Sequence, residues 1–370
     1  MNSKIEKKSR FAGIDLCRGI AAYGVILLHS GDKTWATVHP LSAQLSYLFN
    51  FPVPFFLATS FYLMICRRNP DFSWNYWQVR LQRILFPYII WTIIFLAIKT
   101  IMFLALHQDN KLNELFKDPF SIIFYGGAAI QLYFLPILLV GTSLMIIAFY
   151  LDKTKISIIG LFILTLLSLI SYDLLIITNN TFLLGSDVAF QGLLSQLIPN
   201  QSNSNEVLRF ISVTTAWIVR CLPYFFIAIT WKFILFKSNF TLPFSKLTAT
   251  TLALLVFIII DFLGNWFLPI GFREVLLGYS LLAFGIALSN QLKENNFIKN
   301  LGLCSFGIYL IHPLAINIME ILVKKIQPHL LEQVTILSQM VFSIPSFFIS
   351  WLAVDLLMKN RTISKYLFST

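Results

Sequence analysis

Long apolar segments separated by short polar stretches are the feature that most constrains the fold of this chain. Ten such segments recur along its 370 residues, and each has about the length that crosses a bilayer as a helix. They lie at about 12–29, 43–66, 84–106, 130–150, 156–178, 210–236, 246–265, 270–290, 300–323 and 332–358. Because a backbone in lipid must satisfy its own hydrogen bonds, these runs predict helices and not barrel strands. We expect an all-α, polytopic membrane helix bundle with a single domain over 1–370.

The composition excludes a water-soluble protein. Hydrophobic residues make up 57% of the chain and charged residues only 12%, which is about half the charged share of an ordinary soluble domain. The net charge of +11 lies in short loops and not on one basic stripe, so we expect membrane lipids as neighbours and no nucleic acid as a partner. The four cysteines form no C-x-x-C pair, and there is no H-E-x-x-H motif. We therefore expect no metal.

The placement of lysine and arginine predicts the orientation in the membrane. With ten spans both termini lie on one side, which carries eighteen of these residues, whereas the opposite side carries seven. Cytoplasmic loops are the ones enriched in Lys and Arg. Both termini are therefore expected in the cytoplasm.

Ionisable residues inside the first span suggest a functional site, because such groups are costly in lipid. Arg18 and His29 are eleven residues apart, so a helix places them on one face, about 16 Å apart along its axis. Asp15, one turn before Arg18, can pair with it or orient it. This stripe suits a long ligand with an anionic head and a reactive tail. The alternative is a buried ion pair and an interfacial histidine with structural roles only.

Two further clusters have the residue types of a binding or catalytic site. Arg80 and Arg83 lie one turn apart at the cytoplasmic start of the third span, where guanidinium groups bind phosphates or simply anchor the helix. In the ninth span Ser305, Tyr309 and His312 recur at helical spacing. They are therefore expected to share one face in the middle of the membrane.

At these residues the chain resembles the acyltransferase-3 family, multi-spanning enzymes that acylate surface carbohydrates and related acceptors. The resemblance covers nearly the whole chain. Its most specific part is Asp15-x2-Arg18-Gly19 followed by His29, which matches the Arg-x10-His element of the family. The other matching stretches are Pro54–Phe61, with Thr59-Ser60 in place of Ser-Gly; Arg80 and Arg83, with Val79 in place of a further arginine; Gln131–Pro136, with Tyr133 in place of Trp; and Ser305-x3-Tyr309-x2-His312-Pro313.

The resemblance implies a membrane enzyme that transfers an acyl group, in most cases acetyl, from cytoplasmic acyl-CoA to a carbohydrate hydroxyl. The acceptor would be a carbohydrate or lipid-linked glycan, such as a lipopolysaccharide side chain (O-antigen), a capsule or an exopolysaccharide. The enzyme would lie in the bacterial cytoplasmic (inner) membrane. Neither the acceptor nor the oligomeric state is readable from the sequence.

The same resemblance assigns roles to the candidate residues. Arg18, Arg80 and Arg83 would bind the phosphates of the donor. His29 would take the proton of the acceptor hydroxyl as general base, with Asp15 orienting Arg18. Ser305 and Tyr309 would position His312 or stabilise the oxyanion. A covalent acyl-enzyme on His29, Ser305 or a cysteine stays open.

Two other classes of protein have the same general features. Many spans, prolines within helices and intramembrane His, Asp and Arg are also typical of a proton-coupled transporter. A structural assembly factor could use the buried charges as pairs that fix helix register. Acyl transfer in membranes that contain the protein would separate these possibilities.

Overall fold

The computed structural model describes residues 10–30, 37–65, 74–153, 156–178, 206–237, 245–293 and 295–369. Within these residues the chain forms two compact units. The first unit comprises the described residues of Met1–Phe56, Thr241–Trp266 and Leu276–Asp355. The second comprises those of Leu57–Phe240, Phe267–Val275 and Leu356–Thr370. The prediction of a single domain over 1–370 stays a prediction.

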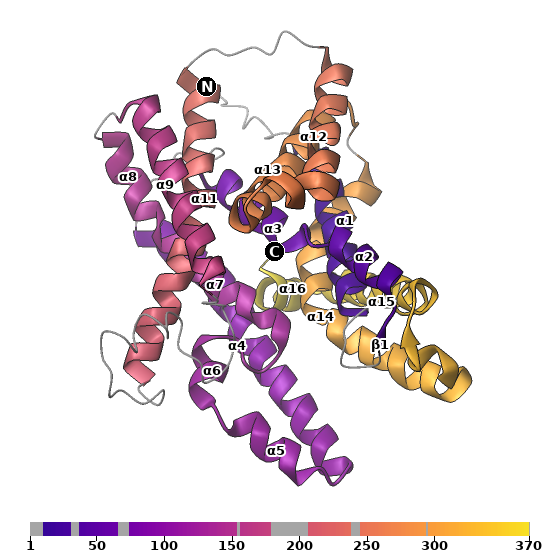
Figure 1. Cartoon of the computed structure of the whole chain (residues 1–370). Helices are drawn as coiled ribbons and strands as arrows, with labels where there is room; N and C mark the ends of the chain where they lie inside the picture. Colours follow the sequence, from indigo (N-terminus) through magenta and orange to yellow (C-terminus); the bar gives the residue numbers. More distant parts are fainter. Residues whose placement is uncertain are drawn as a thin grey trace, which may run out of the picture. The chain divides into compact units, whose positions relative to one another are not determined.

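Ten stretches of helix among the described residues are long and apolar enough to cross a membrane, which confirms the predicted all-α architecture (Figure 1). They comprise α1 (Ala12–Ser30), α2 (Pro40–Leu48) with α3 (Pro52–Ile65), α4 (Trp74–Ala105), η1 (Ile130–Tyr133) with α7 (Phe134–Ser143) and α8 (Met145–Lys153), α9 (Ile158–Ile177), α11 (Glu206–Lys237), α12 (Lys246–Phe267), α13 (Ile270–Ser289), α14 (Asn296–Ile326) and α15 (Ile336–Met358).

Several boundaries differ from the prediction. The helix α4 begins at Trp74, ten residues before the predicted start at 84, so Arg80 and Arg83 lie within the first turns of the helix. The second segment is divided into α2 and α3. Pro52 is the first residue of α3, a position where the missing N–H of proline has no helical partner to lose. Polar flanks extend the helices because backbone hydrogen bonding continues beyond the apolar run.

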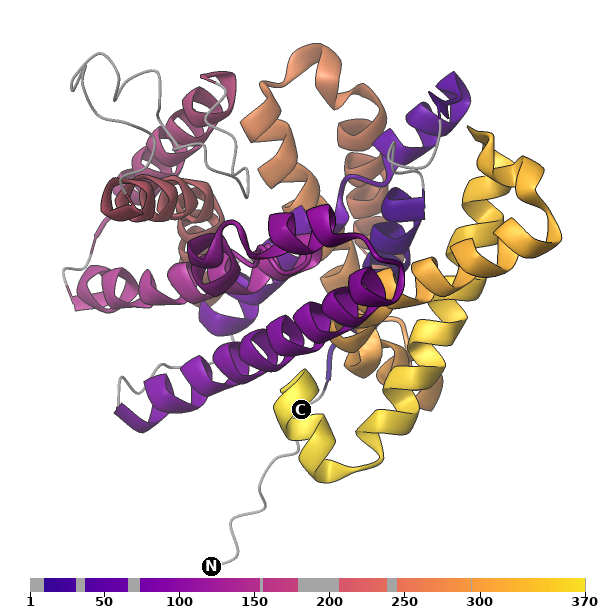
Figure 2. The same cartoon turned by 90° about the horizontal axis from the view of Figure 1, so that it is seen from below.

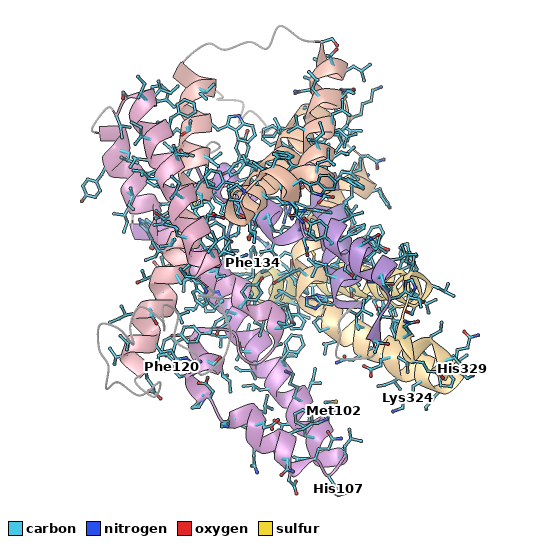
Figure 3. The ribbon with its side chains drawn as sticks, in the orientation of Figure 1. Met102, His107, Phe120, Phe134, Lys324 and His329 are labelled. Carbon is cyan, nitrogen blue, oxygen red and sulfur yellow. The ribbon has the colours of Figure 1, made fainter. Side chains whose placement is uncertain are left out.

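Short elements connect the spans. They are α5 (Asp109–Phe116), α6 (Pro119–Phe124), η2 (Pro328–Leu331), α16 (Arg361–Phe368), and the strands β1 (Thr37–Val38) and β2 (Gln333–Val334), which pair in parallel. Figure 3 labels Met102 and His107 at the end of α4, where the chain turns into α5. His107 has a positive φ of 52° in this turn. Lys324 and His329 mark the turn between α14 and α15.

The first unit is organised around α1 and α14, which pack along each other. The helix α15 joins them through Tyr23 of α1, whose hydroxyl lies 3.2 Å from Ser343 Oγ. The amide of Gln339 donates to Ser46 Oγ of α2 at 2.8 Å. Since Ser343 and Gln339 are buried, these hydrogen bonds fix which faces of the helices meet.

The second unit contains α9 and α11 side by side (Figure 1) and the C-terminal helix α16 against α4 (Figure 2). Trp91 of α4 donates its Nε1–H to the carbonyl of Leu367 at 3.1 Å. Its ring lies 6.3 Å from that of Phe368. These contacts dock α16, whose Asn360 caps its first turn by accepting from the N–H groups of Thr362 and Ile363.

Candidate active site

Two glycines allow α1 and α14 to approach closely in the first unit. A Cβ atom at Gly302 of α14 would lie 2.4 Å from Oδ1 of Asp15, and one at Gly19 of α1 would lie 2.3 Å from the side chain of Leu301. Any side chain at these positions would therefore force the helices apart. Small residues at helix contacts serve this purpose in membranes, where van der Waals packing drives association.

The close packing brings together two of the predicted site residues, His29 and His312. His29 lies in the last turn of α1 and is half-buried, whereas His312 lies in α14 and is fully buried. Their rings are stacked, with centroids 5.0 Å apart and planes inclined by 30°. The sequence indicated each histidine separately, and the fold makes them one pair.

The tautomer of His312 follows from the proline that succeeds it. In an α-helix the N–H of residue i donates to the carbonyl of residue i−4, and Pro313 has no N–H to donate. The carbonyl of Tyr309 therefore lacks its helical donor, and Nδ1 of His312 lies 2.6 Å from this oxygen. Because a carbonyl oxygen can only accept, Nδ1 carries the hydrogen.

Nε2 of His312 is consequently the nitrogen of the neutral ring that can accept a hydrogen bond. This atom is buried and has no hydrogen-bond partner within the described part of the chain. A buried polar atom without a partner costs about 1–3 kcal/mol. A hydroxyl or amide N–H of a substrate could donate the missing hydrogen bond to this nitrogen.

Ser305 and Tyr309 are both buried on the same helix. The hydroxyl of Ser305 donates to the carbonyl of Gly302 at 2.9 Å. Tyr309 acts on His312 through its backbone carbonyl, and its ring lies 5.9 Å from the imidazole. Tyr309 therefore contacts His312 as a positioning residue would, but through its backbone carbonyl and not through its hydroxyl.

Asp15 forms its shortest contacts with Arg10, which is not among the predicted site residues. Arg10 donates from Nε to Oδ2 of Asp15 at 2.5 Å and from Nη2 to Oδ1 at 3.1 Å. Arg18, the predicted partner, has Nη1 3.9 Å from Oδ1. The carboxylate is buried, and the Arg18 side chain is about a quarter exposed, at 26%. Arg10 holds the carboxylate in place, and the side chain of Arg18 is bound less closely to it.

Arg80 and Arg83 belong to the second unit. Both lie in the first turns of α4, where Arg80 is half-buried and Arg83 is exposed. The carbonyl of Arg83 accepts a hydrogen bond from Ser369. Their predicted role with the donor stays a prediction that stands on the sequence.

A second buried polar cluster lies in the second unit and includes a residue that sequence reasoning missed. Glu274, in the second turn of α13, accepts from Nη2 of Arg220 at 2.8 Å and from the hydroxyl of Tyr172 at 2.6 Å. The hydroxyl of Tyr224 lies 3.5 Å from the same carboxylate. Glu274 could have been noticed as an acidic residue within the predicted span 270–290. The adjacent Arg273 suggested instead that this charged pair belongs to a loop at the end of the span.

No group of three or more His, Cys, Asp and Glu residues that could hold a metal ion occurs among the residues that the structure describes. The expectation of no metal stays a prediction.

The chain matches one known family over most of its length. The acyltransferase-3 family model, described as an acyltransferase domain, matches residues 11–355. No curated protein and no solved structure gives a match. The matched region includes α1 and α14 in full, and with them both histidines.

Proposed function

Because the chain belongs to the acyltransferase-3 family, we propose that this membrane acyltransferase moves an acetyl group from acetyl-CoA to a hydroxyl of a cell-surface or secreted carbohydrate. The acceptor classes are lipopolysaccharide O-antigen, capsule and exopolysaccharide. The observation that carries the proposal is the stacked pair of His29 and His312, in which Nε2 of His312 is buried and open to a further hydrogen bond. The family match supports an acyltransferase over the transporter alternative.

The pair supplies what an acyl transfer from a thioester needs. The acceptor oxygen attacks the thioester carbon, the C–S bond breaks, and the hydroxyl proton must pass through a base to the leaving thiolate. His29 is the base in this proposal, because it is half-buried and His312 is fully buried, so a substrate that enters between the helices meets His29 first. An imidazole can accept the hydroxyl proton and return it to sulfur near neutral pH.

His312 has the complementary role of orienting the substrates. Its Nδ1–H is committed to the carbonyl of Tyr309, so its Nε2 can only accept a hydrogen bond while the ring stays neutral. A hydroxyl or amide N–H of a bound substrate satisfies this atom and is thereby held next to His29. A neutral second ring also avoids repulsion when His29 takes up the proton.

The donor would enter from the cytoplasmic side, where the positive-inside bias places both termini. Arg18, about a quarter exposed and on the same helix as His29, would bind an anionic part of the donor. The expected localisation is the bacterial inner membrane. Arg80 and Arg83 keep their predicted role as donor-binding residues on the evidence of their sequence motif.

Transfer of radiolabelled acetyl groups in membranes tests the proposal. Replacement of His29 by alanine should lower transfer by at least about 100-fold, since general base catalysis contributes on this order. The matched control is His329→Ala, because His329 is an exposed histidine in the same unit and should leave transfer unchanged. Full transfer by the His29→Ala variant would contradict the assigned role, and substrate flux without any acyl transfer would favour a transporter.

A separate measurement distinguishes direct transfer from an acyl-enzyme. Purified protein incubated with labelled acetyl-CoA and no acceptor should carry no acyl group on a side chain. A labelled His29, Ser305 or cysteine in the peptide map would contradict direct transfer. Mass spectrometry of surface glycans from a deletion strain would identify the acceptor.

A further inference from the structure

A cavity of about 160 Å³ lies beside the first turn of α1, at the end of the helix remote from His29. Its lining residues come from the start of α1 and the start of α14 and are Arg10, Ala12, Asp15, Asn295, Asn296 and Lys299. All six belong to the first unit. A cavity below about 300 Å³ is too small for a whole cofactor-sized ligand, so it suits one group of a larger molecule.

The lining is rich in hydrogen-bond donors and carries a positive charge. Among the described residues of the lining Asp15 is the one acidic side chain, and both of its oxygens accept from Arg10. The ammonium of Lys299 is therefore the remaining charge of these six residues. Asn295 uses its side-chain oxygen to cap α14 at the N–H of Phe297, so its amide N–H groups are available. Asn296 adds a second amide, and a helix N-terminus favours an anion further.

A phosphate group matches this lining, because it has several acceptor oxygens and a negative charge. Both a phospholipid headgroup and the nucleotide end of acyl-CoA offer such a group. The helix that carries the cavity also carries Arg18 and then His29, which lies about 25 Å from the cavity along the axis of α1. The order of cavity, Arg18 and His29 along α1 follows the order of 3′-phosphate, diphosphate and thioester in an extended acyl-CoA.

We propose that this cavity binds a phosphate at the nucleotide end of the acyl-CoA donor, with Lys299, Asn295 and Asn296 as the contacting side chains. The inference rests on the proposed function, since it presumes an acyl-CoA donor. It adds residues of α14 to donor binding, none of which belongs to the sequence motifs of the family resemblance. Asp15 and Arg10 shape the cavity, and their mutual bonds keep the carboxylate from repelling the phosphate.

Donors of different length test the proposal on the purified full chain. Acetyl-CoA, its 3′-dephospho analogue and S-acetyl-pantetheine all present the same thioester but lose phosphates stepwise. Lys299→Gln should raise KM for acetyl-CoA about tenfold, which corresponds to one charge-assisted hydrogen bond, with kcat within about twofold. The same variant should treat S-acetyl-pantetheine as the wild type does, and Lys299→Arg should restore most of the affinity for acetyl-CoA.

Lys293→Gln is the matched control, because Lys293 is an exposed lysine close in sequence that does not line the cavity. It should leave KM unchanged for every donor. An unchanged KM in Lys299→Gln, or an equal loss with all three donors, would overturn the proposal. A loss that depends on anionic lipid in the nanodisc and not on the donor would assign the cavity to a lipid headgroup and would overturn it equally.

Calorimetric binding of free CoA separates this inference from the proposed function, because it needs no chemistry. Wild-type protein that binds CoA, with about tenfold weaker binding in Lys299→Gln, supports the site even if the acceptor in the assay is wrong. Wild-type protein that binds no CoA and transfers no acetyl group would defeat the proposed function and this inference together. CoA binding and transfer that are insensitive to Lys299 would defeat the inference alone.

Discussion

The two polar clusters of this protein differ in how the group at their centre is hydrogen-bonded. In the second unit the carboxylate of Glu274 has three donors around it, Arg220 and Tyr172 within 2.8 Å and Tyr224 at 3.5 Å. In the first unit His312 has one nitrogen bonded to the carbonyl of Tyr309, and its other nitrogen is buried with no hydrogen-bond partner among the described residues. Both clusters lie on apolar helices, where each polar group is costly.

This difference separates a structural cluster from one that is available for chemistry. The carboxylate of Glu274 already accepts from side chains of two other helices, and these bonds fix how α9, α11 and the first turns of α13 meet. In His312 the tautomer is fixed, so Nε2 can accept a hydrogen bond from one further donor. In the proposed function the histidine pair would contact the substrate, whereas the Glu274 cluster would hold the helices together.

The largest expected effect comes from replacing His312 by its two amide analogues. Asparagine places an N–H where Nδ1 lies and retains the bond to the carbonyl of Tyr309, but it removes Nε2. Glutamine places its amide group near Nε2 instead. If Nε2 contacts the substrate, His312→Asn should fold normally and lose about 100-fold or more in acetyl transfer, since a misplaced substrate forfeits the benefit of orientation.

Thermal unfolding in detergent and the transfer rate, measured together, check this prediction. His312→Gln should retain more activity than His312→Asn while unfolding at a lower temperature. Near-full activity in His312→Asn would mean that the Nδ1 bond is the whole function of this histidine. The contrast between the two clusters would then disappear.

The next effect concerns stability and not catalysis. Glu274→Gln leaves the buried guanidinium of Arg220 without its counter-ion and should destabilise the fold by about 3 kcal/mol. The double variant Arg220→Gln/Glu274→Gln removes both charges and should recover part of this loss. Because no chemistry is assigned to this cluster, the transfer rate of the protein that remains folded should fall far less than in the histidine variants.

A double-mutant cycle of unfolding midpoints gives the coupling between Arg220 and Glu274. Unchanged stability together with a 100-fold loss of transfer in Glu274→Gln would place Glu274 in the catalytic machinery.

The smallest effect is expected at a paired carboxylate near the surface. Asp118 caps α6 by accepting from the N–H of Ser121 at 2.9 Å, and its Oδ2 accepts from Nη2 of Arg209 at 2.7 Å. Burial acts to raise the pKa of Asp118, but the hydrogen bonds from Arg209 and Ser121 outweigh it and lower this pKa below its usual value. A carboxylate whose pKa is lower in the folded protein than in the unfolded chain stabilises the fold at pH values above its unfolded pKa. This stabilisation is lost as the pH falls through the pKa of the folded protein.

Asp118→Asn keeps the helix cap and removes the charge. At pH 7 the wild type should therefore unfold at a slightly higher temperature than Asp118→Asn. The difference in the free energy of unfolding should be no more than about 1 kcal/mol. This difference should vanish as the pH is lowered from about 4. A difference that persists at low pH would show that the charge is not its cause.

Particular residues show how far the sequence could predict the site. Arg18 and His29 lie on one continuous helix as expected, because the spacing along a helix is local information. Glu274 was missed because its importance depends on Tyr172 and Arg220, which arrive from other helices. Arg10 was missed because it precedes the first apolar segment, and only the folded chain turns it back to Asp15.

The amino-acid sequence by itself determined the class of the protein and the number of its spans, because in lipid an apolar run of this length has no alternative to a helix. It also made an acceptor available to Nδ1–H of His312, since Pro313 frees the carbonyl of Tyr309 on the same helix turn. The tertiary structure alone decided that His29 and His312 stack. That contact depends on the packing of two helices from opposite ends of the chain, which no local pattern records.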